Sequence, residues 1–438
     1  MSFESRVRRL RRALPVAMLG AALFAAASQA GPQYQTLYSF CSQSNCADGG
    51  SPRASLASDA DGNLFGTTTG GGAHSQGTVF EFKRNGSSYT FQKIYDFCSQ
   101  AQCADGRGPT SSIVVDVAGN LYGTASSGGV NLAGVAFRLA PPKHGLAWKF
   151  TVLHNFCKQD FCTDGSTPLV GLTYQGAQSG ALYDGTSPLF GLTNQGGSIG
   201  NGGVAYELVF IPGQLRPKEK VVYAFCSFAH CGDGSSPQGP LLFDASGNLF
   251  GLTGAGGSTD NGTAFELSLG RRGYTETVLY NFCRVHNCAD GDVPVGGLAM
   301  DADGNLYGAT QQGGAHSGGT VFKIVNRGIA STESVLYDFC AKADCADGSL
   351  PNGGLLLDAD GNLFGTAANG GNSSNSGLIF EIQAGGLKVL YDFCAQQSCP
   401  DGSFPFAGLT MDGAGNFLGV TTSGGSGVIG GTFFRLTP

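Results

Sequence analysis

Histidine is the side chain in this sequence best suited to proton transfer or metal binding, because its imidazole titrates near neutral pH. Of the six histidines, four fall in glycine-rich or cysteine-flanked segments that read as loops: His74, His230, His286 and His316. Arg284 and Asp292 lie near two of them in the sequence. A neutral imidazole beside a carboxylate could act as a base or as a metal ligand. The alternative is that these are ordinary solvated loop histidines. We take the six residues as the candidate ligand-binding group and leave any catalytic residue unassigned.

Fourteen cysteines form seven pairs, and the members of every pair stand five positions apart. The pairs are Cys41 with Cys46, Cys98 with Cys103, Cys157 with Cys162, Cys226 with Cys231, Cys283 with Cys288, Cys340 with Cys345, and Cys394 with Cys399. Thiolates also bind zinc, but one pair supplies only two of the four ligands that a structural site needs. Equal spacing and the absence of leftover cysteines favour seven local disulfides. Each would contribute about 2 kcal/mol by loop closure.

An aspartate follows the second cysteine of every pair, two residues later, and a glycine follows the aspartate. These residues are Asp48, Asp105, Asp164, Asp233, Asp290, Asp347 and Asp401. We expect them to form a ring where the cysteine loops approach the centre of the fold, and such a ring could hold a cation. The favoured interpretation is a repeated turn, in which the carboxylate accepts backbone amides and the glycine takes a positive φ. No metal or cofactor is therefore expected.

Two further motifs match the sequences of known functional sites but lack the neighbouring residues or elements that those sites need. The segments 59–63, 301–305 and 358–362 read Asp-Ala-Asp-Gly-Asn, like the start of a calcium loop. However, Thr68, Thr310 and Ala367 stand where that loop needs a bidentate glutamate, so a hairpin turn is predicted. Gly196–Gly200 spells a nucleophile elbow, but it lies between two predicted strands, and the chain holds 72 glycines that make such matches common.

These residues lie in a repeat of about 59 residues, the unit that must position them. Each copy begins with Phe-Cys-x4-Cys-x-Asp-Gly-x-x-Pro and continues with four short apolar runs bounded by glycine and aspartate turns. Such runs predict four strands joined as a meander. Seven four-stranded antiparallel blades repeated radially make an all-β, seven-bladed β-propeller. The third copy is the longest, and it carries Asp184–Pro188 where the other copies have the Asp-x-x-Gly-Asn turn.

The two ends of the repeat array predict how the ring closes. The array opens with an outer strand, Leu37–Phe40, and ends with a third strand, Gly431–Leu436. The last blade therefore lacks its own outer strand, and the amino-terminal one is spare. Pairing Leu37–Phe40 with Thr432–Leu436 would close the ring and remove its open sheet edges.

The motifs Gly62–Thr68, Gly-Gly-x4-Gly-Thr-Val-Phe-Glu-Phe at 71–82 and Leu-Tyr-x-Phe resemble the GloVer (Gloeo-Verruco) tandem-repeat family of exported bacterial proteins. The resemblance covers residues 35–437. It implies a secreted β-propeller-like array, and it supplies no activity, because the family has no agreed one.

Residues 1–30 read as a signal peptide, with five arginines, the apolar run Ala13–Ala27 and the cleavage site Ser28–Ala30. An uncleaved membrane anchor is the alternative. Cleavage would leave residues 31–438 as a single propeller domain with 20 basic and 31 acidic residues, a net charge of −11. That charge argues against nucleic-acid binding. We expect a secreted or periplasmic bacterial protein with no membrane contact after cleavage, because the chain ends at Pro438, just past the last strand. We also expect a monomer.

Function is the least determined property of this sequence. The favoured hypothesis is a rigid binding module for an extracellular glycan or protein, in which variable loop residues recognise the ligand. A polysaccharide lyase or glycosidase with its site over the channel mouth is one alternative, and a structural envelope protein is another. Any site should lie on the face of the cysteine and Gly-Gly loops, towards the sector of His230, Arg284, His286, Asp292 and His316.

Overall fold

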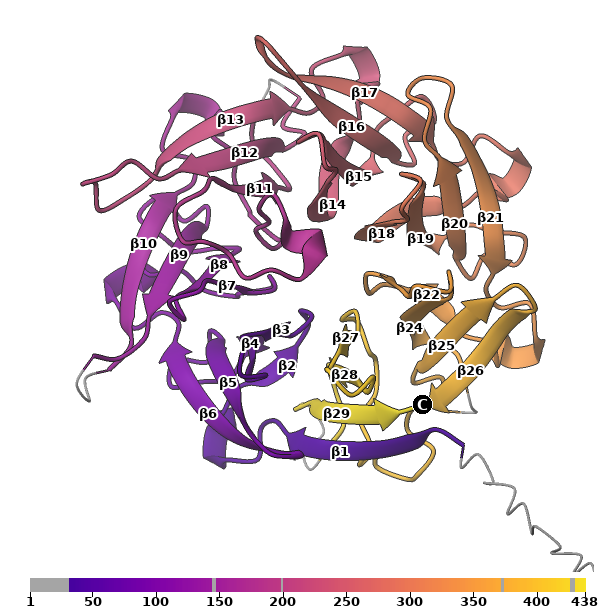
Figure 1. Ribbon diagram of the computed structural model, residues 1–438, viewed down its shortest axis with the longest axis horizontal. Coiled ribbons are helices and arrows are strands. Elements are labelled where there is room, and N and C mark those ends of the chain that lie inside the picture. The colour runs from indigo at the N-terminus through magenta and orange to yellow at the C-terminus, as the bar shows by residue number, and fades with distance from the viewer. Residues whose placement is uncertain (1–30, 144–146, 198–199, 372–373, 426–429) are drawn as a thin grey trace, which may run out of the picture. The chain divides into compact units, whose positions relative to one another are not determined.

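Seven antiparallel sheets succeed one another around the ring shown in Figure 1. The computed structural model describes residues 31–143, 147–197, 200–371, 374–425 and 430–438. The predicted signal peptide, residues 1–30, lies outside the described residues. Residues Pro32–Pro438 form one unit, the propeller. The predicted seven-bladed all-β propeller is therefore confirmed.

The strands of the first four blades are given from the inner strand outward. Blade 1 contains β2 (Gly50–Pro52) with β3 (Ala57–Ser58), β4 (Leu64–Gly70), β5 (Thr78–Asn85) and β6 (Ser88–Asp96). Blade 2 contains β7 (Val114–Val115), β8 (Leu121–Ala125), β9 (Val135–Ala140) and β10 (Lys149–Asn155). Blade 3 contains β11 (Leu189–Thr193), β12 (Val204–Val209) and β13 (Lys218–Ala224). Blade 4 contains β14 (Ser235–Phe243), β15 (Leu249–Ala255), β16 (Thr263–Gly270) and β17 (Gly273–Asn281).

The remaining blades follow the same plan. Blade 5 contains β18 (Asp292–Met300), β19 (Leu306–Gln312), β20 (Thr320–Val325) and β21 (Thr332–Asp338). Blade 6 contains β22 (Ser349–Pro351) with β23 (Leu356–Leu357), β24 (Leu363–Asn369), β25 (Leu378–Gln383) and β26 (Gly386–Asp392). Blade 7 contains β27 (Thr410–Met411), β28 (Phe417–Val420), β29 (Thr432–Thr437) and β1 (Gln33–Ser39). Short 3-10 turns are η1 (Ser44–Cys46), η2 (Ala101–Cys103), η3 (Asp160–Cys162), η4 (Ala177–Ser179), η5 (Ala229–Cys231), η6 (His286–Cys288) and η7 (Ala343–Cys345).

The first and last strands of the array close the ring, as predicted. β1 pairs antiparallel with β29, and the register runs from Gln33 opposite Thr437 to Ser39 opposite Thr432. Across the seam between blades 7 and 1, the rings of Phe82 and Phe433 stack with centroids 4.1 Å apart. Figure 1 shows β1 lying outside β29 at the rim. The outer strand of blade 7 thus comes from the opposite end of the chain.

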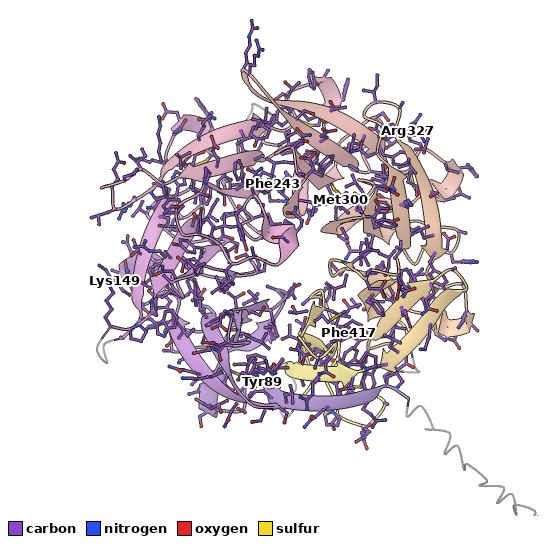
Figure 2. All side chains as sticks on the ribbon, viewed as in Figure 1. Tyr89, Lys149, Phe243, Met300, Arg327 and Phe417 are labelled. Carbon is purple, nitrogen blue, oxygen red and sulfur yellow. A yellow bond between two sulfur atoms is a disulfide. The ribbon has the colours of Figure 1, made fainter. Side chains whose placement is uncertain are left out.

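The core lies between neighbouring blades. Each apolar cluster joins the second and third strands of one blade to those of the next; Phe65 of blade 1, for example, packs with Leu121 and Phe137 of blade 2. Figure 2 shows the side chains in these spaces, including Phe243 and Phe417, which belong to two such clusters. Strands buried on both faces explain why the second and third runs of each repeat are nearly continuously apolar.

The hairpins between the first and second strands have the predicted turn in place of a calcium loop. In blade 1, Asp59 Oδ1 accepts the amides of Asp61 at 3.0 Å and Asn63 at 2.9 Å. The Asn63 side chain donates to Asp59 Oδ2 at 2.8 Å. Gly62 has a φ of +78°, which favours glycine. The carboxylate is therefore committed to the turn.

Blade 3 departs from the expected four strands. Its inner segment pairs with β11 only through an isolated bridge between Thr173 and Phe190, and its sheet has three strands. The extra residues of this repeat form hydrogen bonds with the neighbouring blades. The Val117 amide of blade 2 donates to the Tyr183 carbonyl at 2.9 Å, and the Gln178 side chain donates to the Phe243 carbonyl of blade 4 at 2.6 Å. The insertion thus adds hydrogen bonds to blades 2 and 4, while the inner segment keeps bridges to its own blade at Ser166–Gln195 and Thr173–Phe190.

All seven predicted disulfides are present, each joining cysteines five residues apart. They join Cys41 to Cys46, Cys98 to Cys103, Cys157 to Cys162, Cys226 to Cys231, Cys283 to Cys288, Cys340 to Cys345, and Cys394 to Cys399. Each bond closes the loop that leads from the outer strand of one blade to the inner strand of the next. The prediction of local pairing is therefore confirmed at every pair.

Among the described residues, no helix is long and apolar enough to cross a bilayer.

Candidate functional site

The cysteine loops are built around the repeated aspartates. Asp105 is fully buried, and it accepts the Tyr95 hydroxyl at 2.7 Å and the amides of Ser99 and Gln100 at 2.9 and 3.1 Å. The following glycine, Gly106, has a φ of +93°. A tyrosine hydroxyl reaches the aspartate in the same way in six loops, and His154 replaces the tyrosine in the remaining one. The turn interpretation of these aspartates is confirmed.

The last cysteine loop keeps the aspartate but uses it slightly differently. Asp401, two residues after Cys399, accepts the Tyr391 hydroxyl at 2.9 Å and the amide of Cys394 at 2.9 Å. In the other loops the amides that reach the aspartate come from the two residues after the first cysteine, as in Ser99 and Gln100. The disulfide of Cys394 and Cys399 is nevertheless present, so the staple tolerates this change in the turn.

The position expected for the aspartate ring was wrong. The tyrosine, or His154, that reaches each aspartate belongs to the outer strand of the preceding blade, so the carboxylates lie at the rim and not at the channel. The repeated Phe-Cys-x4-Cys-x-Asp-Gly-x-x-Pro motif predicts a loop, but it does not show which end of the loop lies towards the channel. In the part of the chain that the structure describes, no three His, Cys, Asp or Glu side chains group so as to hold a metal ion.

A β-bulge directs each of these tyrosines towards its aspartate. In β6, the register against β5 shifts between Lys93 and Tyr95, which leaves Ile94 unpaired. The same shift occurs one residue before the tyrosine, or before His154, in the outer strand of every blade. Such bulges turn a side chain away from its regular direction. The rim contact is therefore a regular feature of the repeat.

The predicted histidine sector lies on exposed loops. His74, His230, His286, His316 and Arg284 are all exposed. Asp292, which is half-buried, accepts the Asn261 side chain at 2.8 Å. The structure records no hydrogen bond or ion pair between any two of these six described residues. Their role in binding stays a prediction.

Exposed apolar side chains gather on the same loops. Phe161, Phe228 and Val285 stand in the cysteine loops that enter blades 3, 4 and 5, and Phe161 is 94% exposed. Val130 and Leu132 stand in the Gly-Gly loop of blade 2. The Gly-Gly loops adjoin the cysteine loops, since the Gly72 amide donates to the Cys46 carbonyl at 2.9 Å and equivalent bonds recur in the other blades. Other exposed apolar side chains, among them Val117, Ile329 and Met411, lie outside these loops, so the loop residues alone do not define a contact surface.

The central channel contains a cavity of about 420 Å³, lined by the inner segments of all seven blades. Five of its lining residues directly follow the proline of their repeat: Arg53, Thr110, Leu169, Asn352 and Phe406. Because each cysteine loop leads straight into that proline, these residues lie towards the end of the channel that faces the loops. The Arg53 guanidinium lies 5.2 Å from the centroid of the Phe406 ring, a cation–π contact.

Glycines let the inner segments approach one another at the channel. A Cβ on Gly296 would lie 2.6 Å from the Asn352 carbonyl oxygen, and one on Gly353 would lie 2.6 Å from the Gly408 amide nitrogen. No side chain fits there without backbone movement. The inner segments of blades 5, 6 and 7 therefore pack closely at the channel, and the post-proline side chains provide its variable chemistry.

A second set of variable positions lies at the rim, where the outer strands of neighbouring blades meet. The residue seven positions before the first cysteine of each loop faces the tyrosine, or His154, of the preceding blade. It is aromatic or apolar at four junctions; Phe91, for example, stacks on Tyr38 with ring centroids 4.4 Å apart. At three consecutive junctions it is a glutamate: Glu219, Glu276 and Glu333.

Burial, and secondarily the charge of the nearby aspartate, raises the pKa of each of these three glutamates to about 7. One carboxylate oxygen of each is buried and has no hydrogen-bond partner among the described residues. The sequence interpretation missed both variable sets, the channel residues and the rim glutamates. Aligning the seven repeats column by column would have revealed seven residue types in the first set and three glutamates among aromatic and apolar residues in the second.

These features define a closed β-propeller with stapled loops on one face and two sets of variable positions, at the channel and at the rim. The Gloeobacter/Verrucomicrobia repeat matches residues 21–204 and 177–434 of the chain. The chain therefore belongs to this repeat family, as its motifs indicated. No curated protein matches it closely enough to supply a function.

Proposed function

We propose that the protein is an exported binding module that takes an extracellular glycan at the channel mouth, on the face of the cysteine loops. The observation that carries this proposal is the set of post-proline residues. They are Arg53, Thr110, Leu169, Gln238, Val295, Asn352 and Phe406, seven different residue types at the position directly after a proline that every repeat keeps. Variation on a rigid frame is how a symmetric scaffold acquires a specific site.

The chemistry of the channel mouth suits a sugar. Phe406 offers an apolar ring, Arg53 offers charged donors, and Thr110 and Asn352 offer groups that can bond hydroxyls. A cavity of about 420 Å³ is within the range of small-ligand sites. Among the described residues that line it, only Arg53 is charged, whereas a glycosidase needs two carboxyl groups. Binding is therefore favoured over hydrolysis at this position.

Export is part of the proposal, and it is supported by the seven disulfides. Disulfides form and persist in oxidising compartments such as the bacterial periplasm and the extracellular space. The arginine-rich leader and its cleavage site give the route. Amino-terminal sequencing of the processed protein should find Gly31 as its first residue.

The test is a glycan array, followed by titration of the best glycan. The double variant Arg53→Ala/Phe406→Ala should weaken binding at least tenfold, about 1.4 kcal/mol. His286→Ala/His316→Ala should also weaken binding at least tenfold if the ligand extends over the predicted loop sector. Asp303→Ala, an exposed change on the opposite hairpin face, is the control and should bind as the unchanged protein does.

Two results would contradict the proposal. Loss of binding in the hairpin-face variant, with normal binding in both loop-face variants, would place the site on the other face. Release of new reducing ends from the bound glycan would show that the protein is a glycosidase. Release of unsaturated sugars would show that it is a lyase.

A further inference from the structure

The junction between blades 2 and 3 is unlike the other six rim junctions. His154 stands where the other blades have tyrosine, and the facing residue is Glu219 in place of a ring. No other junction carries both changes. A cleft of about 790 Å³ opens at this point, and the connection 210–217 and the Gly-Gly loop of blade 2 contribute to its lining. Several departures from the repeat thus converge on one concave site.

The His154–Asp164 pair forms the floor of the cleft. His154 Nε2 lies 3.1 Å from Asp164 Oδ2, and the imidazole is mostly buried, with its edge against the Phe156 ring. Burial alone would raise the pKa of Asp164, but hydrogen bonds from His154 and from the amides of Lys158 and Gln159 outweigh it and lower the pKa. The charge of Asp164 is therefore satisfied within the protein and is not available to an incoming cation.

Three cations line the cleft of this acidic protein, together with the Glu219 carboxyl group, whose pKa burial raises to about 7. Lys158, Arg216 and Lys218 line it and are exposed, so they could turn towards a ligand. Amide side chains line it as well: Gln100, Asn131, Asn155, Gln159 and Gln214. Cations attract carboxylates, while amides both donate to and accept from hydroxyl groups. This combination suits a ligand that carries carboxylates and many hydroxyls.

From these contacts we infer that the cleft between the outer strands of blades 2 and 3 is a second binding site, for an acidic oligosaccharide that contains uronic acid residues. Its volume matches that of small-ligand sites. Leu215, which stands between the lining residues Gln214 and Arg216, and Phe161, two residues after Gln159, are exposed apolar side chains. The lining residues of this rim cleft and those of the channel are different, so the two sites are separable by mutation.

The experiment is calorimetric titration of the purified protein with a hexamer of galacturonic acid, and with a neutral xylose hexamer for comparison. The acidic hexamer should bind, and rising salt should weaken it because exposed charges are screened. Lys158→Ala/Lys218→Ala should weaken it at least tenfold. Lys220→Ala is the matched control on the same strand, because its ammonium is held by Glu207 at 2.6 Å and does not line the cleft.

A repeat-derived variant tests the cleft without loss of fold. His154→Tyr/Glu219→Phe rebuilds the Tyr95–Phe150 junction between blades 1 and 2, whose rings stack at 4.4 Å. It should fold normally and bind the acidic hexamer at least tenfold more weakly. Arg53→Ala should leave this binding unchanged, which distinguishes the rim cleft from the channel mouth.

Several outcomes would overturn the inference. They are equal binding of the neutral hexamer, equal binding of hexaglutamate, and normal binding of the acidic hexamer by both rim double variants. Absence of binding at millimolar concentration would overturn it as well.

Discussion

At the residue scale, the positions that are repeated seven times maintain the fold, and the positions that vary carry the differences in chemistry. Asp105 illustrates the first kind, because removing its buried carboxylate would leave two amides and the Tyr95 hydroxyl without their acceptor. An unsatisfied buried donor costs about 1–3 kcal/mol. Glu276 illustrates the second kind, because an aromatic or apolar side chain fills its position in four blades. It places a second carboxyl group near Asp233.

The glutamate junctions predict a pH-dependent stability. The pKa of Glu276 is raised to about 7, above the value of about 4.3 that is usual in an unfolded chain. The folded state therefore binds this proton more tightly, so its contribution to stability is full below about pH 4 and is lost as the pH rises to about 7. Glu276→Gln stays neutral at every pH. It should raise the free energy of unfolding at pH 8 by roughly 1–3 kcal/mol more than it does at pH 4.

Urea unfolding of Glu276→Gln and of the unchanged protein at the two pH values measures this difference. Asp303→Asn, on an exposed hairpin, serves as the control for the loss of one negative charge. An equal effect of Glu276→Gln at pH 4 and pH 8 would show that Glu276 titrates alike in the folded and unfolded states.

At the element scale, each cysteine loop is a short stapled turn that holds one variable residue at its tip. The residue before the second cysteine takes a left-handed conformation in every loop; it is Phe161 in one loop and His230 in another, with φ near +58° and +56°. A left-handed backbone is uncommon outside glycine. The disulfide and the aspartate hold this conformation together, so the tip residue can vary without change to the frame.

The staple predicts a moderate loss of stability when one disulfide is removed. Cys283→Ser/Cys288→Ser should lower the free energy of unfolding by about 2 kcal/mol, because the loop closed by the bond is short. The fold should persist, since Asp290 still accepts the Tyr280 hydroxyl and the amides of Arg284 and Val285. Denaturant unfolding measures the loss, and peptide mapping without reduction checks the pairing. A peptide linking Cys46 to Cys98 would contradict the local scheme.

The sequence predicted the strands and the disulfides because both depend on local spacing that recurs in every repeat. It misplaced the aspartate ring, since spacing along the chain does not say whether a loop residue faces the rim or the channel. It missed the Arg53–Phe406 contact, whose partners are brought together only by closure of the ring. It also missed His154 and Glu219, because a bulge and the meeting of two outer strands bring this junction together.

At the scale of the whole molecule, closure determines which edges are exposed. Without β1, the strand β29 would become an open edge, and the Phe433 cluster would lose the Tyr38 and Phe40 side chains that pack on it. The Tyr34–Tyr391 stack, with centroids 3.9 Å apart, would also be lost from the seam between blades 6 and 7. An open edge of this length is a template for pairing with another chain. Closure therefore contributes both stability and resistance to association.

A circular permutant tests closure without removing any strand. Since Gln33 lies opposite Thr437, an Asn-Gly turn can join Thr437 to Gln33 and make β29 and β1 a continuous hairpin. The new chain would begin at Ala47 and end at Cys46, directly after the loop that the Cys41–Cys46 bond closes. Its free energy of unfolding should lie within about 1 kcal/mol of that of the unchanged protein, because it keeps every strand pair.

A truncation that lacks Gln33–Phe40 should be markedly less stable, and light scattering should show that it self-associates. If the truncated chain is as stable and monomeric as the full one, then the β1–β29 pair does not hold the ring closed.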